Sequence, residues 1–160
     1  MNFRHLTIAV LGTCLCCLFY SCTDPNDFEE HHILENENWS MHDPITFAFD
    51  IADTSALYQF GMHFRYTDTF LWQDLFLFMQ TTLPDGRLSQ DTLHCFLFGP
   101  DGKPLGKGHR VKELKIGYSL LRFPMPGHYS LRFTQGMRAE KIRGIASIGI
   151  SLKKTESVTQ

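Results

Sequence analysis

The stretch LFLFMQTTLPDGRLSQDTLHCFLF, residues 75–98, decides the fold class. Its first residues are apolar on both faces of an extended chain, as expected for the central strand of a β-sheet. The tripeptide Pro84-Asp85-Gly86 favours a turn, because proline and glycine supply the backbone angles that a chain reversal needs. A second apolar run follows at 92–98. The sequence therefore predicts a β-hairpin here.

Outward from this hairpin, apolar residues recur at every second position, which is the period of a half-buried strand. In ITFAFDI, residues 45–51, the odd positions are apolar. In YQFGMHFRY, residues 58–66, the even positions are apolar, and Gln59, His63 and Arg65 are expected on the opposite face. Three later segments also have strand-like composition: YSLLRF at 118–123, HYSLRFTQ at 128–135 and IASIGISL at 145–152.

Turn signals separate these strands. PMPG at 124–127 is expected to join two of them, and GPDGKPLGKG at 99–108 is expected to form a glycine-rich loop. The segment QGMRAEKIRG, residues 135–144, favours one short helical turn. Seven to eight short strands without a long helix predict an all-β fold, an antiparallel β-sandwich of the immunoglobulin-like or jelly-roll-like type. The 14 phenylalanines of the chain are expected to fill the space between the two sheets.

The N-terminus has a different character. Residues 6–20 carry no charge and follow Arg4, and this apolar run is too short for a typical membrane-spanning helix. It has the length of the hydrophobic region of a secretory signal peptide. Ser21-Cys22 at its end resembles the processing site of bacterial lipoproteins, where the new N-terminal cysteine carries lipid. Processing at Cys14, or an uncleaved anchor helix, is the alternative.

This interpretation divides the chain into a signal peptide (1–21), a lipidated Cys22 with a polar tether (22–38), a sandwich domain (39–154) and a polar C-terminal tail (155–160). Attachment to a membrane would rest on the lipid of Cys22 alone. Cys95 would then be the one thiol of the mature domain, and its apolar neighbours predict a buried, unreactive side chain. Loss of Arg4 changes the net charge from −2 to −3, which argues against a nucleic-acid partner.

Catalytic patterns are weak in this sequence. Asp85, Asp91 and Asp101 lie in or near predicted turns, and no serine lies in a Gly-x-Ser-x-Gly elbow. The motif EEHH at 29–32, with His42, has metal-ligand residue types, but a tether would not fix their geometry. We expect no catalytic residue, no metal site and no cofactor apart from the covalent lipid.

Several collinear segments carry a resemblance to a known family. They are LFLFMQTTLPDGRLSQDTLHCFL (75–97), GPDGKPLGKG (99–108), RFPMPGHYSLRFTQGMR (122–138) and IRGIASIGISLKK (142–154), with Trp39, Asp43-Pro44 and FAFDIADTS upstream. In this order they resemble the gliding motility lipoprotein family GldH of Bacteroidota. The resemblance implies a lipid-anchored envelope protein, on the periplasmic face or at the outer membrane, that is needed for gliding and is tied to the machinery that moves and secretes surface adhesins. It supplies no catalytic residues.

Two binding functions fit such a domain. The first is a non-enzymatic accessory that docks onto other envelope proteins or onto gliding and secretion components. Its expected contact residues are Trp72, in the loop at 67–74, and Lys103 and Lys107, in the glycine-rich loop. The alternative is a carbohydrate-binding module that presents Trp39, Trp72 and Tyr66 to sugars. An envelope enzyme is a third hypothesis, and the leaflet that holds the lipid stays open.

Overall fold

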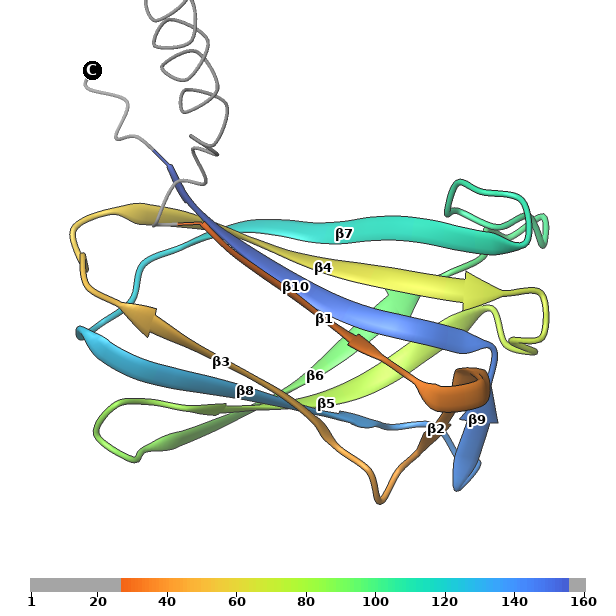
Figure 1. The fold of residues 1–160 in the computed structure, drawn as a ribbon, viewed down its shortest axis with the longest axis horizontal. Helices are drawn as coiled ribbons and strands as arrows, with labels where there is room; N and C mark the ends of the chain where they lie inside the picture. The colour runs from red at the N-terminus through yellow and green to blue at the C-terminus, as the bar shows by residue number, and fades with distance from the viewer. Residues whose placement is uncertain (1–26, 156–160) are drawn as a thin grey trace, which may run out of the picture.

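Two antiparallel β-sheets of four strands each face one another and form a sandwich, in a computed structural model that describes residues 27–155 (Figure 1). One sheet, called sheet A, consists of β1 (Phe28–Ile33), β10 (Ile145–Thr155), β4 (Leu57–Thr67) and β7 (Val111–Leu121), in this spatial order. The other, called sheet C, consists of β3 (Ile45–Ile51), β8 (Gly127–Gln135), β5 (Asp74–Thr82) and β6 (Leu88–Phe96). The expected all-β sandwich is therefore confirmed.

The order of the strands is that of a jelly roll. Within each sheet the hydrogen-bonded neighbours are distant in sequence, except for the β5–β6 hairpin in sheet C. Every other connection between successive sandwich strands crosses from one sheet to the other. Eight strands wound in this way form the jelly-roll version of the two-sheet fold, which decides between the two types expected from the sequence.

A small ribbon lies at one end of the sandwich (Figure 1). The strands β2 (Asn38–Ser40) and β9 (Lys141–Arg143) pair with each other, and a short 3-10 turn, η2 (Glu35–Glu37), precedes β2. The helical turn expected at 135–144 is wrong. A strand forms there instead, because Ile142 is fully buried and its neighbours on either side are exposed, which is the alternation of a strand.

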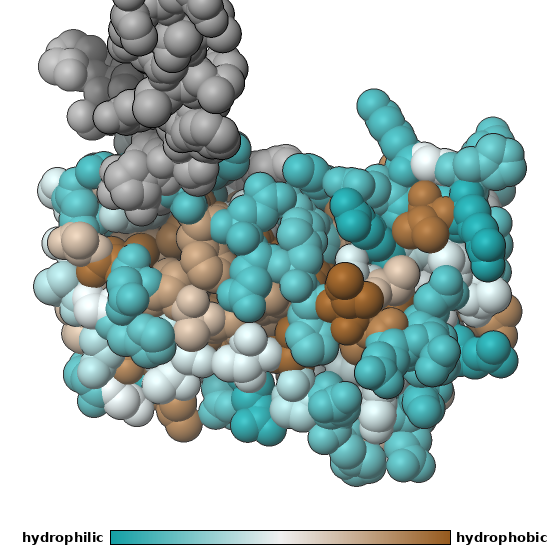
Figure 2. Space-filling view, viewed as in Figure 1, coloured by the Kyte–Doolittle hydropathy of each residue, from teal (hydrophilic) through white to brown (hydrophobic). Residues whose placement is uncertain are grey.

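The core lies between the two sheets and is rich in aromatic rings. Alternate residues of β3 are buried, as its sequence predicted, and Phe47 meets Phe133 of β8 edge to face with ring centroids 5.9 Å apart. Figure 2, viewed from the same side as Figure 1, shows hydrophobic residues between the sheets and hydrophilic residues over much of the remaining surface. Burial of such rings is the main favourable contribution to the stability of a sandwich.

The Pro84-Asp85-Gly86 turn connects β5 and β6, which confirms the predicted hairpin. Gly86 has a φ of 83°, a conformation that glycine adopts without strain. The expectation that β5 is buried on both faces is wrong, however. Phe76 and Phe78 point away from the core and are 36% and 54% exposed, since no second layer covers the outer face of sheet C among the described residues.

The N-terminal part of the domain begins earlier than expected. Strand β1 pairs along its whole length with β10 and lies within the segment 22–38, so the expectation of a tether is wrong from Phe28 onward. Phe28 packs on Phe49 with ring centroids 5.5 Å apart. The polar side chains of β1 are compatible with a strand because β1 forms the edge of sheet A. Residues 1–26, with the predicted signal peptide and Cys22, and residues 156–160 of the predicted tail lie outside the described residues.

The two ends of the sandwich differ. Phe28 pairs with Leu152, near the end where β10 leaves the domain, whereas Ile33 pairs with Ser147 at the opposite end. That opposite end carries the β4–β5 loop (68–73) and the β6–β7 loop (97–110), which Figure 1 shows side by side. We call it the distal end. Among residues 27–155 no helix is long and apolar enough to cross a membrane.

A candidate protein-docking surface around strand β6

Strand β6 is an edge strand with apolar side chains on both faces. It pairs with β5 on one side, and the structure places no described strand on its other side. Cys95 points into the sandwich and is buried, whereas His94 and Phe96 point outward. An edge strand offers unpaired backbone N–H and C=O groups, and a partner strand can pair with them.

The outer face of β6 and β5 carries what we call the aromatic patch, composed of Phe76, Phe78, His94 and Phe96. The rings of Phe76 and His94 are stacked with centroids 4.2 Å apart, and the centroid of Phe96 lies 4.3 Å from that of His94. His94 is held from the other side by the carboxylate of Asp74. The patch is therefore a preorganised set of exposed rings, a composition typical of the central part of protein interfaces.

The inner side of β6 borders an apolar cleft of about 680 Å³. It lies where β6 and β7, the outermost strands of the two sheets, face each other across the sandwich. The side chains that line it include Met62, Leu93, Cys95, Ile116, Leu121 and Leu131. His94 and Phe96 also line its rim, so the cleft and the aromatic patch form one continuous surface.

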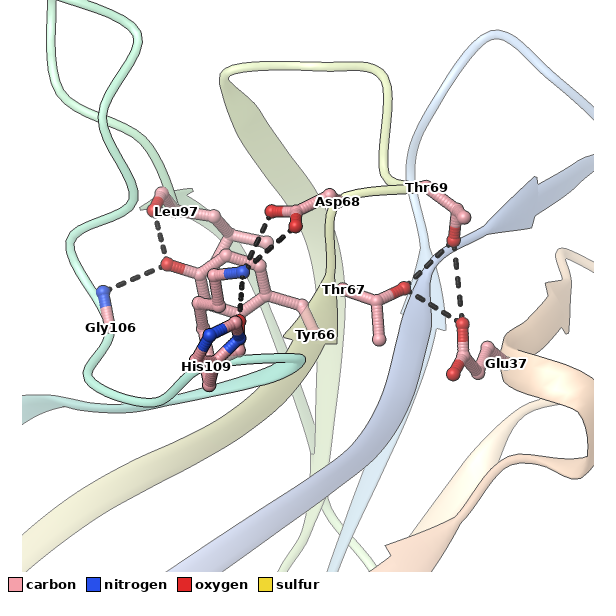
Figure 3. Close-up of polar contacts among 9 residues, drawn as sticks. Glu37, Tyr66, Thr67, Asp68, Thr69, Leu97, Gly106 and His109 are labelled. Carbon is pink, nitrogen blue, oxygen red and sulfur yellow. Dashed lines mark hydrogen bonds and ion pairs between the residues drawn. The ribbon is translucent and has the colours of Figure 1, made fainter.

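Polar contacts fix the loops at the distal end (Figure 3). The hydroxyl of Tyr66, on β4, donates a hydrogen bond to the carbonyl of Leu97 at 2.5 Å and accepts one from the N–H of Gly106 at 2.8 Å. Burial of this hydroxyl raises the pKa of Tyr66, so it stays a donor at neutral pH. Both loop partners belong to the β6–β7 loop, which one side chain therefore holds at two points.

Lys112 also holds the loops of the distal end together. Its ammonium group lies 2.8 Å from a carboxylate oxygen of Asp68 and 2.6 Å from the carbonyl of His109, so it joins the β4–β5 loop to the β6–β7 loop. The hydroxyl of Thr67 donates to Glu37 of η2 at 2.7 Å. The distal loops are thus positioned by the strands beneath them.

The structure brings the three expected contact residues to this distal end. Lys103 and Lys107 are exposed in the β6–β7 loop, and the amine of Lys103 lies 2.9 Å from Asp101. Trp72 is partly buried, because its ring packs against that of Phe70 with centroids 5.4 Å apart. Two of the three side chains therefore lie on the surface, and the third presents part of its ring.

The residues expected to bind sugars do not form a site. Trp39 and Tyr66 are both 0% exposed. The indole N–H of Trp39 donates to the carbonyl of Asp43 at 2.8 Å, which makes it part of the core. Since a sugar can stack only on an exposed ring, this set of residues does not support the carbohydrate-binding hypothesis.

Catalytic chemistry has little support in the described part of the chain. Burial raises the pKa of the Cys95 thiol to about 11, which keeps it protonated, as the sequence predicted. Asp85 and Asp101 accept hydrogen bonds from the backbone of Arg87 and Lys103, two residues further on, and so stabilise turns. Asp91 lies within β6 rather than in a turn.

The sequence interpretation missed the aromatic patch, and it misplaced the EEHH motif. Glu29 and His31 are not on a tether: they lie on β1, where hydrogen bonds fix the backbone. His42 lies apart from them, 3.7 Å from Glu140. Thr92 and His94, the cross-strand neighbours of Phe78 and Phe76, are polar, but LFLFMQ has no polar residue before Gln80 that would mark an exposed face.

Comparison with known proteins identifies relatives over almost the whole domain. Residues 26–152 match the family model described as GldH lipoprotein. The chain is 26% identical over 149 residues to the gliding motility lipoprotein GldH homolog of Christiangramia forsetii, covering 88% of this chain and 91% of that protein. It is 25% identical over 165 residues to the gliding motility lipoprotein GldH of Flavobacterium johnsoniae, covering 98% and 100% of the two chains.

Two solved structures show remote similarity to this chain. A chain of infectious bursal disease virus, Gx strain, aligns with 83% of this protein at a TM-score of 0.37 and 14% identity, over 30% of its own length. A chain of dimeric latent PorU from Porphyromonas gingivalis aligns with 81% at a TM-score of 0.36 and 11% identity, over 13% of its length.

Proposed function

The chain belongs to the GldH lipoprotein family, and from this premise we propose that it is a non-enzymatic accessory of the gliding motility and adhesin secretion machinery. In this proposal the protein is anchored in the cell envelope by lipid on Cys22. Its folded domain docks onto another envelope protein through the surface around β6. The contact extends to Trp72, Lys103 and Lys107 at the distal end.

The observation that carries this proposal is the exposure of apolar side chains on both faces of the sheet edge formed by β5 and β6. Phe78 and Phe96 are 54% and 50% exposed on the outer face, and the apolar cleft opens on the inner face. Contiguous exposed apolar surface on a folded domain marks interaction sites, because it is unfavourable in water unless a partner covers it. Leu105, also 50% exposed, extends this surface into the β6–β7 loop.

The position of β1 supports an orientation relative to the membrane. Cys22 precedes Phe28 by six residues, which span at most about 20 Å when extended. Phe28 lies at the end of sheet A opposite the distal loops, and the 11 residues of β4 cover about 36 Å between the two ends. A lipid on Cys22 would hold the first end close to the membrane, so the distal loops would face away from it.

The proposal also states that the protein catalyses no reaction. The support for this statement is chemical: most side chains that line the cleft are apolar, and its one thiol is kept protonated by burial. His94 lies at the rim, where it contacts Asp74 and stacks on Phe76. Substrate chemistry needs a nucleophile, an acid or a base of suitable pKa in such a cavity.

The test is a set of surface variants in the native cell. The double variant Phe78→Ser, Phe96→Ser should abolish spreading and adhesin delivery to the surface as deletion of the gene does, while membrane attachment and protein level stay unchanged. The matched control is Leu88→Ser, because Leu88 is 60% exposed at the other end of β6. Normal spreading and normal adhesin delivery in the double variant would contradict the proposal.

A further inference from the structure

Three side chains with metal-binding atoms meet on the outer face of sheet A. Glu29 and His31 come from β1, and His63 comes from β4. Oε1 of Glu29 lies 3.2 Å from Nε2 of His31 and 3.3 Å from Nδ1 of His63. Within residues 27–155, these three side chains bring their potential ligand atoms to within 4.8 Å of one another.

The register of the sheet explains how the three meet. Strand β10 lies between β1 and β4, and its residue Gly149 is paired with His31 on one side and His63 on the other. Gly149 has no side chain, so the two imidazole rings approach over it to a centroid distance of 5.2 Å. A Cβ atom at position 149 would lie 2.3 Å from Nδ1 of His31. Glycine is therefore what permits the cluster.

His63 is unusual for an outward-pointing histidine, because its side chain is only 3% exposed. Its Nε2 atom lies 3.0 Å from the hydroxyl of Ser151, and its Nδ1 atom is buried and makes no hydrogen bond. In the tautomer that leaves Nδ1 unprotonated, Nε2 donates its proton to Ser151. The lone pair of Nδ1 then lies 3.3 Å from Oε1 of Glu29, and a cation held by both atoms would satisfy them.

We propose that Glu29, His31 and His63 bind a divalent transition-metal cation of the zinc type, which ties the edge strand β1 to the inner strand β4. Two imidazole nitrogens and one carboxylate oxygen form a set that zinc accepts, and water would complete the coordination. Ligand atoms around a tetrahedral zinc ion lie about 3.3 Å apart, so two of the three separations already fit. Ser151 would fix the tautomer of His63 from outside.

The charges around the cluster both favour and oppose a cation. The side chain of His63 is 3% exposed and its Nδ1 atom has no hydrogen-bond partner, so a cation at Nδ1 would supply the missing interaction. The carboxylate of Glu29, 44% exposed beside the two imidazole rings, supplies the negative charge that favours a cation. Lys115 lies opposite His63 on β7, and its positive charge weakens the binding of a cation without abolishing it.

The test is isothermal titration calorimetry of the full chain with zinc chloride. The protein is extracted from membranes in detergent, treated with a chelator, and purified through a tag that contains no histidine. We expect one saturable zinc site per chain. His31→Ala and Glu29→Gln should each weaken zinc binding tenfold or more, and both residues are exposed enough for the variants to fold. Lys115→Gln should strengthen binding several-fold.

His32→Ala is the matched control, since His32 is the next residue on β1 but is not part of the cluster. The zinc affinity of His32→Ala should stay within twofold of that of the parent protein. Zinc should also raise the melting temperature of the parent and of His32→Ala, and should not raise that of His31→Ala. Absence of zinc binding, or equal affinity in His31→Ala, Glu29→Gln and the parent, would overturn the proposal.

Discussion

The ring of Phe76 lies flat against that of His94, with centroids 4.2 Å apart and planes inclined by 8°, on a face of the sandwich that no described element covers. The two residues are direct cross-strand neighbours on β5 and β6. Such a pair stabilises the hairpin modestly, and it also presents a flat aromatic surface to solvent. Its exposure is the feature that a docking function explains.

Because the patch is exposed, its side chains should contribute little to folding. We expect Phe78→Ser to change the free energy of unfolding by about 0.5 kcal/mol or less, since surface substitutions rarely do more. Phe133→Ala, at a fully buried ring of β8, should cost about 3–5 kcal/mol. Urea unfolding followed by circular dichroism measures both. A large loss of stability in Phe78→Ser would mean that the patch serves the fold rather than a partner.

Tyr66 should control the order of the β6–β7 loop. Tyr66→Phe leaves the N–H of Gly106 without its acceptor, whereas the carbonyl of Leu97 keeps the hydrogen bond from the N–H of Leu105. We therefore expect about 1–3 kcal/mol of destabilisation and faster proteolytic cleavage within 97–110. Tyr58→Phe is the control, because the hydroxyl of Tyr58 bonds the carbonyl of Asp53 at 2.9 Å at the other end of β4. Limited proteolysis with mass spectrometry should find unchanged cleavage of the loop in that control. Equal cleavage in both variants would be evidence against this role of Tyr66.

The burial of His63 predicts a dependence of stability on pH. Its folded-state pKa lies below the ordinary value of 6.5, because burial and Lys115 disfavour the charged ring, although Glu29 and Glu113 act in the opposite direction. Unfolding therefore takes up a proton once the pH falls below 6.5, and stability decreases until the pH reaches the folded-state pKa. Metal-free protein should thus lose stability as the pH falls below 6.5.

His63→Gln should remove part of this decrease, as urea unfolding at a series of pH values would reveal. His31 contributes a positive charge when it is protonated, so the same series is measured for His31→Ala, in which the His63 effect should persist. An unchanged pH profile in His63→Gln would assign the decrease to other groups.

Lipid attachment at Cys22 is tested separately from docking. Cys22→Ala should abolish incorporation of labelled palmitate and release the domain from the membrane fraction, because a lipid held by one residue is the whole predicted anchor. Cys14→Ala is the control and should leave labelling unchanged. Labelled protein in Cys22→Ala would show that another residue carries the lipid.

The sandwich could be predicted because most of its strands alternate apolar and polar residues with a period of two. Strand β1 could not, because FEEHHI is polar at nearly every position and is held at a sheet edge by its backbone pairing with β10. The first half of β7, VKELKI, was missed for a similar reason, although Lys112 in it is buried through its contact with Asp68.

The candidate sites were harder to predict from the sequence than the strands. Phe76 and Phe78 could not be assigned to the surface without knowing that only two layers of sheet exist. The meeting of His31 and His63 depends on the position of Gly149 between them, which follows from the register of three strands and not from any local motif. The position of Lys103 and Lys107 in a loop was easier to predict, because they lie in a segment with obvious turn residues.

Photo-crosslinking in living cells tests the docking surface most directly. A photoreactive amino acid is placed at position 78 or 96 in the aromatic patch, or at position 50, whose side chain is exposed at the far edge of sheet C. We expect positions 78 and 96 to yield the same crosslinked envelope protein in high amount and position 50 to yield none of it. Phe76→Ser should reduce the yield at position 96. No adduct at 78 and 96, or the same adduct in equal amount at position 50, would contradict the docking proposal.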